Sequence, residues 1–315
     1  MEKMNSNHQQ YTPLISCVIA TYNRSSIISN AINSIRIQTY SNWELIVVDD
    51  QSTDNTWKVI NHFSTIDDRI HCHRNPNKGA NNARNLGIEK SRGKYIAFLD
   101  DDDTSYPHRF KSQVEAMINT GYRFIVSWYD IRERDTDRVL KVEKKEHRGS
   151  QVGFPSRWMI EKSLLDLVGG FNPRMSAMQD IEISTRIAQI YTYAHHNDIV
   201  TTIYRTPGST SSGKSAIQGK IQLLEEVGHL MFPEERSDWH FHIALAFCRN
   251  NQARNCMKHI QEAIEIDNRL LYKNVNIYFK LVNKLKSQLW KKIGCTVFSY
   301  INEHTFPKIV EHPSV

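Results

Sequence analysis

Short apolar segments alternate with helical patterns over the first hundred residues. Residues 14–20 are rich in β-branched side chains and lie between Pro13 and a polar stretch, which predicts a buried strand. Apolar positions then recur at helical spacing from Ser26 to Ile35. Further strands are predicted at 43–48, 70–73 and 95–99, and further helices at 56–63 and 80–91. This order predicts an α/β fold with a mostly parallel sheet and right-handed crossovers.

The pattern changes in the second half of the chain. It predicts helices at 109–120 and 156–168, another helix opening at Gln179, and strands at 124–128 and 200–204. The heavily charged stretch 130–148 predicts a hairpin or a solvated loop. From residue 216 onward the pattern is helical, and 244–264 resembles one tetratricopeptide-like hairpin. We therefore expect a polar tail at 1–12, an α/β domain at 13–213 and a helical region at 214–315.

The predicted strand at 95–99 ends in four consecutive carboxylates, Asp100 to Asp103. Like charges at this spacing repel by about 1 kcal/mol per close pair in water, and by more when they are buried. A bound Mg²⁺ or Mn²⁺ would offset that repulsion, because these ions bind carboxylate and phosphate oxygens. A solvated acidic turn explains the charges equally well. Charge alone therefore leaves open whether this segment is a metal–diphosphate site.

Polar loops follow three of the predicted strands, at 21–24, 49–54 and 100–103. Parallel sheets of this kind bind ligands at the carboxyl ends of their strands, so the three loops are expected to converge on one edge. Gly79 suits a backbone position with positive φ before the helix at 80–91, and Arg84 lies one turn into that helix, within reach of a phosphate.

Composition describes an ordinary globular protein of 315 residues, with 40% apolar residues and a net charge of +6. The polar start lacks the apolar core of a signal peptide, and no apolar run approaches the ~18 residues that cross a bilayer. We therefore expect a cytoplasmic protein. The five cysteines show no Cys-x-x-Cys pair, which predicts free thiols in a reducing compartment. The histidines show no spacing that demands a metal, and His240 and His242 are predicted to be structural or exposed.

The positive charge is concentrated near the C-terminus, and the rest of the chain is close to neutral. No acidic residue lies between Asp267 and Glu303, a stretch that contains Arg269, Lys273, Lys280, Lys284, Lys286, Lys291 and Lys292. An apolar stripe accompanies these cations and could pack on the α/β domain, form an oligomer surface or contact an anionic membrane at its inner face. Binding of nucleic acid is not expected, because the tail has no stacking platform or reading motif.

Four segments in order, 19–24, 44–56, 79–87 and 93–103, resemble the successive motifs of family 2 nucleotide-sugar glycosyltransferases with the GT-A fold. The resemblance implies a Rossmann-like half at 13–103 that holds a nucleoside diphosphate, commonly UDP, and an acceptor half at 104–213. It also implies Mn²⁺ or Mg²⁺ as cofactor.

The resemblance assigns roles to individual residues. Asp102 and Asp100 fall on the Asp-x-Asp positions that hold the metal, and Asp180 falls on the general base. The positions that would bind the nucleotide are Thr21, Tyr22, Arg24, Asp49, Asp50, Lys78, Arg84, Asp100 and Asp101. The chain departs from the family pattern at Gln179, where the family usually has an acidic residue, and at Pro207, where many relatives have a histidine.

The function implied is inverting transfer of a sugar from a nucleoside diphosphate, with UDP expected, to a hydroxyl of a glycan or lipid-linked acceptor in bacterial surface polysaccharide synthesis. Two alternatives stay open at this point. A metal-dependent nucleotidyltransferase would share the sheet and the acidic ligands but normally has a glycine-rich loop after the first strand. A non-catalytic sugar-nucleotide-binding protein is favoured only by Gln179. Trp128, Trp158 and Tyr106 could stack on a sugar, although ordinary packing explains them too.

Overall fold

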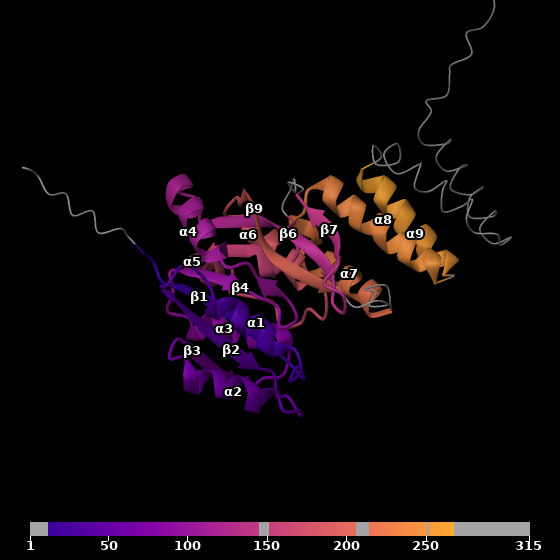
Figure 1. Ribbon diagram of the computed structural model, residues 1–315. Coiled ribbons are helices and arrows are strands. Elements are labelled where there is room, and N and C mark those ends of the chain that lie inside the picture. The colour runs from indigo at the N-terminus through magenta and orange to yellow at the C-terminus, as the bar shows by residue number, and fades with distance from the viewer. Residues whose placement is uncertain (1–11, 145–150, 206–213, 251, 268–315) are drawn as a thin grey trace, which may run out of the picture. The chain divides into compact units, whose positions relative to one another are not determined.

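The computed structural model describes residues 12–144, 151–205, 214–250 and 252–267. Contacts divide the chain into two compact units, Met1–Thr210 and Ser211–Val315, and each is described by itself. Figure 1 shows the path of the chain, with the α/β unit in indigo to salmon and the helices that follow in orange. Pro207 and the basic tail lie outside the described residues, so the predictions about them stay predictions.

A single mixed sheet forms the centre of the first unit, with the order β3-β2-β1-β4-β8-β6-β9-β5, and β7 pairs with β6. The first four strands in this order are parallel, whereas β8 runs antiparallel to both β4 and β6. The strands are β1 (Ile15–Thr21), β2 (Trp43–Asp49), β3 (Ile70–Arg74), β4 (Tyr95–Phe98), β5 (Thr104–Ser105), β6 (Phe124–Glu133), β7 (Val139–Glu143), β8 (Trp158–Glu161) and β9 (Ala194–Arg205).

Helices cover both faces of this sheet, which explains why its central strands are apolar along their whole length. The helices are α1 (Ile28–Arg36), α2 (Thr56–Ile66), α3 (Ala80–Lys90), α4 (Arg109–Thr120), α5 (Lys162–Leu167) and α6 (Gln179–Ala188). One face packs on α1, α2 and α4 through side chains such as Cys17 and Leu45. The other packs on α3, α5 and α6 through Val18 and Ile46. The predicted α/β fold with its mostly parallel first half is confirmed.

The prediction of a helix at 156–168 is wrong for the first half of this segment. A 3₁₀ turn, η1 (Pro155–Arg157), leads into β8, and only then does α5 begin. Trp158, Met159 and Ile160 are all fully buried between β4 and β6. A strand that is buried on both faces gives a continuous apolar run without the alternation that identifies a strand, so its periodicity did not reveal it.

Two other strands extend beyond their predictions. β6 continues to Glu133 and turns into β7, so the charged stretch that begins at residue 130 starts as a hairpin, one of its two predicted forms. β9 begins at Ala194, six residues before the predicted start, because it follows β6 in parallel along nearly its whole length. The carboxyl ends of β6 and β9 place Arg134 and Tyr204 beside the loop after β4, where they contact Asp102 and Asp103.

A buried arginine fixes the end of β4. Arg109 is fully buried on α4 and donates to the carbonyl oxygens of Phe98 and Trp158, each at 3.0 Å. Its remaining nitrogens bond to Ser105 and Gln113. This arginine therefore connects β4, β8 and α4 at the point where the acidic loop begins.

Gly87 lets α3 approach β1 closely. A Cβ atom at this position would lie 2.3 Å from Cγ1 of Val18 on β1. We expect Gly87→Ala to lower the free energy of unfolding by about 1–2 kcal/mol, because overpacking costs about 1–3 kcal/mol and outweighs a gain in helix propensity of about 1 kcal/mol. Urea unfolding measures the difference. The exposed Glu89→Ala on the same helix is the control, and a Gly87→Ala protein as stable as that control would contradict the close packing.

The second unit consists of helices within its described residues, as predicted. These are α7 (Lys214–Val227), a short 3₁₀ turn at Gly228–Leu230, α8 (Pro233–Arg249) and α9 (Ala253–Ile266). None of the helices in the described ranges has both the length and the apolar character to cross a bilayer.

The prediction of free thiols is wrong for two of the five cysteines, because Cys248 and Cys256 form a disulfide. They are eight residues apart on opposite sides of the turn between α8 and α9, and the helical hairpin brings their Cα atoms to 5.5 Å. Cys17 and Cys72 are free, and Cys295 lies outside the described residues.

Candidate active site

The loops that follow β1, β2 and β4 lie at the carboxyl edge of the parallel strands. β1 and β2 pair with Thr21 opposite Asp49, so both strands end at the same level. The next residue, Asp50, donates its backbone N–H to the Thr21 carbonyl at 2.8 Å. The convergence of polar loops predicted from the sequence is therefore present at this edge.

The two aspartates at the end of β2 are buried and hold neighbouring loops. Asp49 is fully buried and accepts the backbone N–H of Ser52. Asp50 accepts the Gly79 N–H at 2.8 Å and the side-chain amide of Asn75 at 2.6 Å. Asp50 thereby positions the loop before α3. Gly79 has φ of +131° there, a conformation that glycine adopts readily.

Tyr22 and Lys78 form the exposed side of this edge. The Lys78 ammonium lies 4.9 Å from the centre of the Tyr22 ring, a distance typical of a cation–π contact. Thr21 is buried directly behind them at the end of β1. The structure thus brings the five predicted positions from β1 and β2, together with Lys78, to adjoining loops.

Each of the first three carboxylates after β4 has its shortest ion-pair contact with a different arginine. Asp100 forms an ion pair with Arg84 on α3 at 2.9 Å. Asp101 lies 3.5 Å from Arg24, and Asp102 lies 3.6 Å from Arg134. Three arginines from three separate elements therefore surround the outer three carboxylates of the loop.

Asp103 is buried and holds the loop in place. Its carboxylate accepts the Ser156 hydroxyl at 2.8 Å and the Tyr204 backbone N–H at 3.3 Å. The same Ser156 oxygen accepts the backbone N–H of Asp100 at 3.0 Å. Asp103 and Ser156 therefore fix both ends of the acidic turn, which leaves Asp100 and Asp102 as its more exposed carboxylates.

The pKa values of these carboxylates show how much negative charge is concentrated there. Burial, together with the charge of Asp102, raises the pKa of Asp101 to about 6. Burial and the charge of Asp100 raise the pKa of Asp102, and burial with the charges of both neighbours raises that of Asp103 well above its usual range. A positive ion at this loop would relieve the repulsion.

The donor set suits a hard divalent cation bound jointly with a diphosphate. Among the described residues no three carboxylate, histidine or cysteine ligands converge at this loop. Mg²⁺ and Mn²⁺ are commonly held by one or two carboxylates plus substrate phosphates, and Asp100 and Asp102 are the more exposed carboxylates of this loop. Arg84 adds a buried nitrogen, Nη1, that has no hydrogen-bond partner within the described parts of the chain.

Asp180 is the second residue of α6, and its carboxylate is held by backbone donors. It accepts the N–H groups of Phe154 and Ile181, both at 3.0 Å. Burial raises the pKa of Asp180, and the charge of Asp100 adds to this effect.

Several residues of the site were not predicted. Arg134 belongs to the charged stretch that was predicted only as a hairpin or loop, and Ser156 was placed in a helix. Neither carried a motif, and only the pairing of β6, β8 and β9 brings them to the acidic turn. Of the aromatic candidates, Trp158 is fully buried and belongs to the core. Tyr106 donates its hydroxyl to Asp130 at 3.1 Å.

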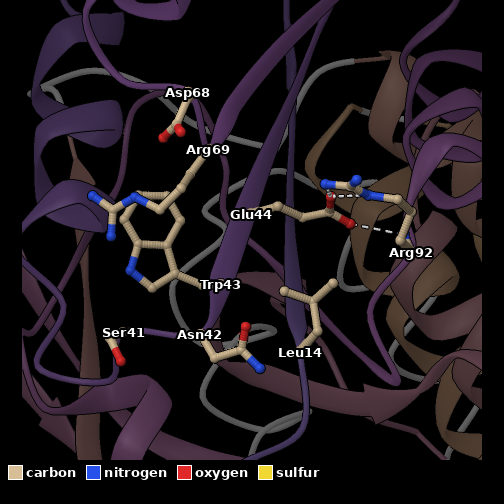
Figure 2. Close-up of a pocket in the computed structure, with 8 residues that line it drawn as sticks. All are labelled: Leu14, Ser41, Asn42, Trp43, Glu44, Asp68, Arg69 and Arg92. Atoms are coloured by element: carbon tan, nitrogen blue, oxygen red, sulfur yellow. Dashed lines mark hydrogen bonds and ion pairs between the residues drawn. The ribbon is translucent and has the colours of Figure 1, made fainter.

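A separate hollow of about 430 Å³ lies at the opposite edge, below the amino ends of β1 and β2. Figure 2 shows Arg92 paired with the buried Glu44, at 2.8 Å, and the Arg69 guanidinium stacked on Trp43. Glu44 also accepts the Ser16 hydroxyl at 2.6 Å. The Glu44 carboxylate is thus already paired, and none of the predicted site residues lines the hollow.

Comparison with known proteins decides the family. The model for glycosyl transferase family 2 matches residues 16–176, which include β1 to β4, the acidic loop and β8. The chain belongs to glycosyl transferase family 2. The match ends four residues before Asp180, so the role of that residue stays a prediction.

Relatives in this family match about two fifths of the chain. A Bacillus subtilis protein named for teichuronic acid biosynthesis, the glycosyltransferase TuaG, is 35% identical over 126 residues, 40% of this chain and 50% of its own length. The Escherichia coli protein "UDP-Glc:alpha-D-GlcNAc-diphosphoundecaprenol beta-1,3-glucosyltransferase WfgD" is 40% identical over 119 residues, 38% of this chain and 46% of its own. The chain therefore spans about half the length of these relatives.

Solved structures show the same fold at low sequence identity. The crystal structure of S. aureus TarS 1-349 in complex with UDP has a TM-score of 0.59 and 14% identity, over 91% of this chain and 88% of the other. The complex of the same protein with UDP-GlcNAc has a TM-score of 0.54 over 89% of this chain and 79% of the other. This likeness confirms the predicted fold of the family 2 chain, including its C-terminal helices.

Proposed function

We propose that the protein is an inverting glycosyltransferase that moves a sugar from a UDP-sugar to a hydroxyl of a glycan or lipid-linked acceptor. The observation that supports this most is Arg84, which pairs with Asp100 and keeps a buried guanidinium nitrogen without a partner among the described residues. A diphosphate oxygen is the ligand that such a nitrogen would bind. The family and the UDP-containing complexes of TarS add support for a nucleoside diphosphate.

In this proposal the nucleoside lies against the ends of β1 and β2, and the diphosphate lies between Arg84 and the acidic loop. Tyr22 forms the exposed wall for the base, with the buried Thr21 and Asp49 behind it, while Asp50 keeps the loop of Lys78 in place. Arg24 would exchange its contact with Asp101 for a phosphate oxygen. Asp102 and Asp100 would hold Mn²⁺ or Mg²⁺, which supplies a Lewis acid for the departing diphosphate when it is bound.

The chemistry requires a base for the acceptor. The sugar–phosphate bond breaks through a transition state that resembles an oxocarbenium ion, and the incoming hydroxyl must lose its proton. Asp180 accepts that proton from the face opposite the leaving group, and this single displacement inverts the anomeric configuration. The two backbone N–H groups that bind Asp180 hold its carboxylate in one orientation.

The rate of transfer is expected to fall at acidic pH with an inflection above the ordinary aspartate value of about 3.9. Asp180 must be ionised to accept a proton, and burial raises its pKa, so protonation begins at a higher pH than for an exposed aspartate. A profile of kcat against pH measures this fall in rate on the acidic side. A rate that stays constant down to pH 4, with the protein still folded by circular dichroism, would contradict the role of Asp180.

The proposed reaction is tested by release of UDP from a panel of UDP-sugars, with and without Mn²⁺, in the presence of polyprenyl diphosphate-linked and free glycan acceptors. We expect release that depends on the acceptor, and a product with inverted anomeric configuration by NMR. UDP-glucose is the first donor to test, because the name of the E. coli relative includes it. Binding of UDP without release from any donor would instead favour the non-catalytic alternative.

A place at the inner face of the bacterial membrane follows from the same proposal. The E. coli relative is named for a diphosphoundecaprenol-linked acceptor, and the B. subtilis relative is named for teichuronic acid biosynthesis. The basic segment at 269–292 would contribute contact with anionic lipid. Sedimentation with vesicles containing phosphatidylglycerol, at low and high salt, measures that contact.

A further inference from the structure

Three side chains of the helical unit converge on one point between α8 and α9. The Nδ1 atoms of His240 and His259 lie 3.1 Å apart. The Oε2 atom of Glu262 lies 2.9 Å from the first nitrogen and 3.0 Å from the second. Two imidazoles and one carboxylate therefore form a nearly equilateral triangle, although 19 residues separate the two histidines.

These separations match those between ligands of a tetrahedral zinc ion. Zinc bonds of about 2.0–2.1 Å at tetrahedral angles place neighbouring ligand atoms about 3.3 Å apart. Imidazole nitrogen and carboxylate oxygen are both common zinc ligands, and a set of two histidines and one glutamate leaves a fourth position for water. The geometry of the three atoms thus provides one face of a tetrahedron.

Hydrogen bonds do not account fully for this cluster. Glu262 Oε2 is buried and forms no hydrogen bond of acceptable geometry within the described residues, despite the two short distances. Only one proton fits between two Nδ1 atoms that face each other, so at least one of them must present a lone pair to the cluster. When both imidazoles carry their proton on Nε2, both Nδ1 atoms and Glu262 Oε2 offer a lone pair toward a common centre, which is the arrangement that a cation requires.

The surrounding helices hold these side chains in position. Ser237, one turn before His240, donates to the Ala263 carbonyl at 2.7 Å, and the Cys248–Cys256 disulfide joins the other end of the hairpin. The Phe247 ring stacks on His259 with an interplanar angle of 17°. Lys258 faces the other oxygen of Glu262, at 3.8 Å from Oε1, which leaves Oε2 directed at the histidines.

We propose that His240, His259 and Glu262 bind a zinc ion that joins α8 to α9. This site is separate from the acidic loop after β4, which offers only oxygen ligands. The histidine spacing gave no sign of it, because His240 and His259 lie on different helices. The expectation that His240 is merely structural or exposed is replaced here by a ligand role.

The test uses the untagged full chain carrying Asp102→Asn, which removes a carboxylate proposed to bind metal at the other site. After treatment with EDTA and dialysis, Zn²⁺ is titrated by calorimetry, and Co²⁺ is added in parallel because tetrahedral Co²⁺ absorbs strongly in the visible range. We expect one equivalent of tightly bound Zn²⁺, tetrahedral Co²⁺ bands and a higher melting temperature with zinc.

Three further variants are made in the same background. His259→Gln and Glu262→Gln are each expected to weaken zinc binding by at least about tenfold and to abolish the Co²⁺ bands, in line with the loss of one ligand. His242→Gln, on the same helix but outside the triangle, is the matched control and should bind zinc like its parent. Circular dichroism checks that each variant is folded.

Absence of zinc binding in the parent would overturn the proposal. The proposal would also be overturned if the His259→Gln and Glu262→Gln proteins bound zinc as tightly as the parent does, since the ion would then lie elsewhere. Loss of zinc in the His242→Gln protein would also contradict the assigned ligands. None of these outcomes depends on glycosyl transfer, so the proposal and the proposed function can fail separately.

Discussion

Asp180→Asn is expected to reduce sugar transfer by about 10²–10⁴-fold and to leave the affinity for UDP unchanged. The asparagine side chain keeps the shape, and its single oxygen can still accept one of the two N–H groups that bind the carboxylate, but it cannot take a proton from the acceptor hydroxyl. Initial rates measure the first effect, and calorimetric titration with UDP and Mn²⁺ measures the second.

Asp166→Asn is the matched control for this substitution. Asp166 is an exposed aspartate on α5 whose ion pair is with Lys162, and the change should leave both rate and affinity as they are. A turnover of the Asp180→Asn protein close to that of the control would remove Asp180 from the mechanism. If the Asp180→Asn protein lost both UDP binding and turnover, the result would instead indicate that Asp180 supports the shape of the site.

Asp102→Asn is expected to lower the transfer rate by about 10²–10³-fold, the usual effect of removing one group that stabilises a developing negative charge. It should also abolish the gain in UDP affinity that Mn²⁺ provides. Without added metal, UDP is expected to bind this variant at least as well as the parent, because one carboxylate no longer repels the diphosphate. Titrations of UDP with and without Mn²⁺ separate these two effects.

Asp68→Asn serves as the control for this second substitution, since Asp68 is an exposed aspartate at the opposite edge of the sheet. The transfer rate of the Asp68→Asn protein, and the effect of Mn²⁺ on its affinity for UDP, should equal those of the parent. If Mn²⁺ strengthened UDP binding to the Asp102→Asn protein as much as to this control, the metal would not be held by Asp102.

The fold was largely predictable from the sequence because its first half consists of regular strand–helix pairs. The helix α4 was predicted with its observed bounds, Arg109–Thr120, since Gly121 ends it in a left-handed conformation that favours glycine. β8 was missed because a strand buried on both faces has no alternation to detect. The prediction for β9 was too short because the first residues of this strand are polar, and only their pairing with β6 makes them part of a strand.

The site was predictable where the sequence motifs themselves supply its residues. Asp100 to Asp103 follow β4 directly, and Arg84 lies at a fixed distance into α3, so their proximity follows from the parallel sheet. Arg134 and Ser156 come from elements far along the chain and were missed, because local sequence carries no sign of such contacts. The triangle of His240, His259 and Glu262 was missed for the same reason.

The central claim is that a nucleoside diphosphate binds at the carboxyl edge of the parallel strands, between Arg84 and the acidic loop. A crystal structure of the full chain with UDP and Mn²⁺ tests it most directly. The account predicts diphosphate oxygens bonded to Nη1 of Arg84, with Mn²⁺ between them and Asp102. A nucleotide seated instead in the hollow beside Trp43 and Arg92, with Asp102 facing only solvent, would contradict it.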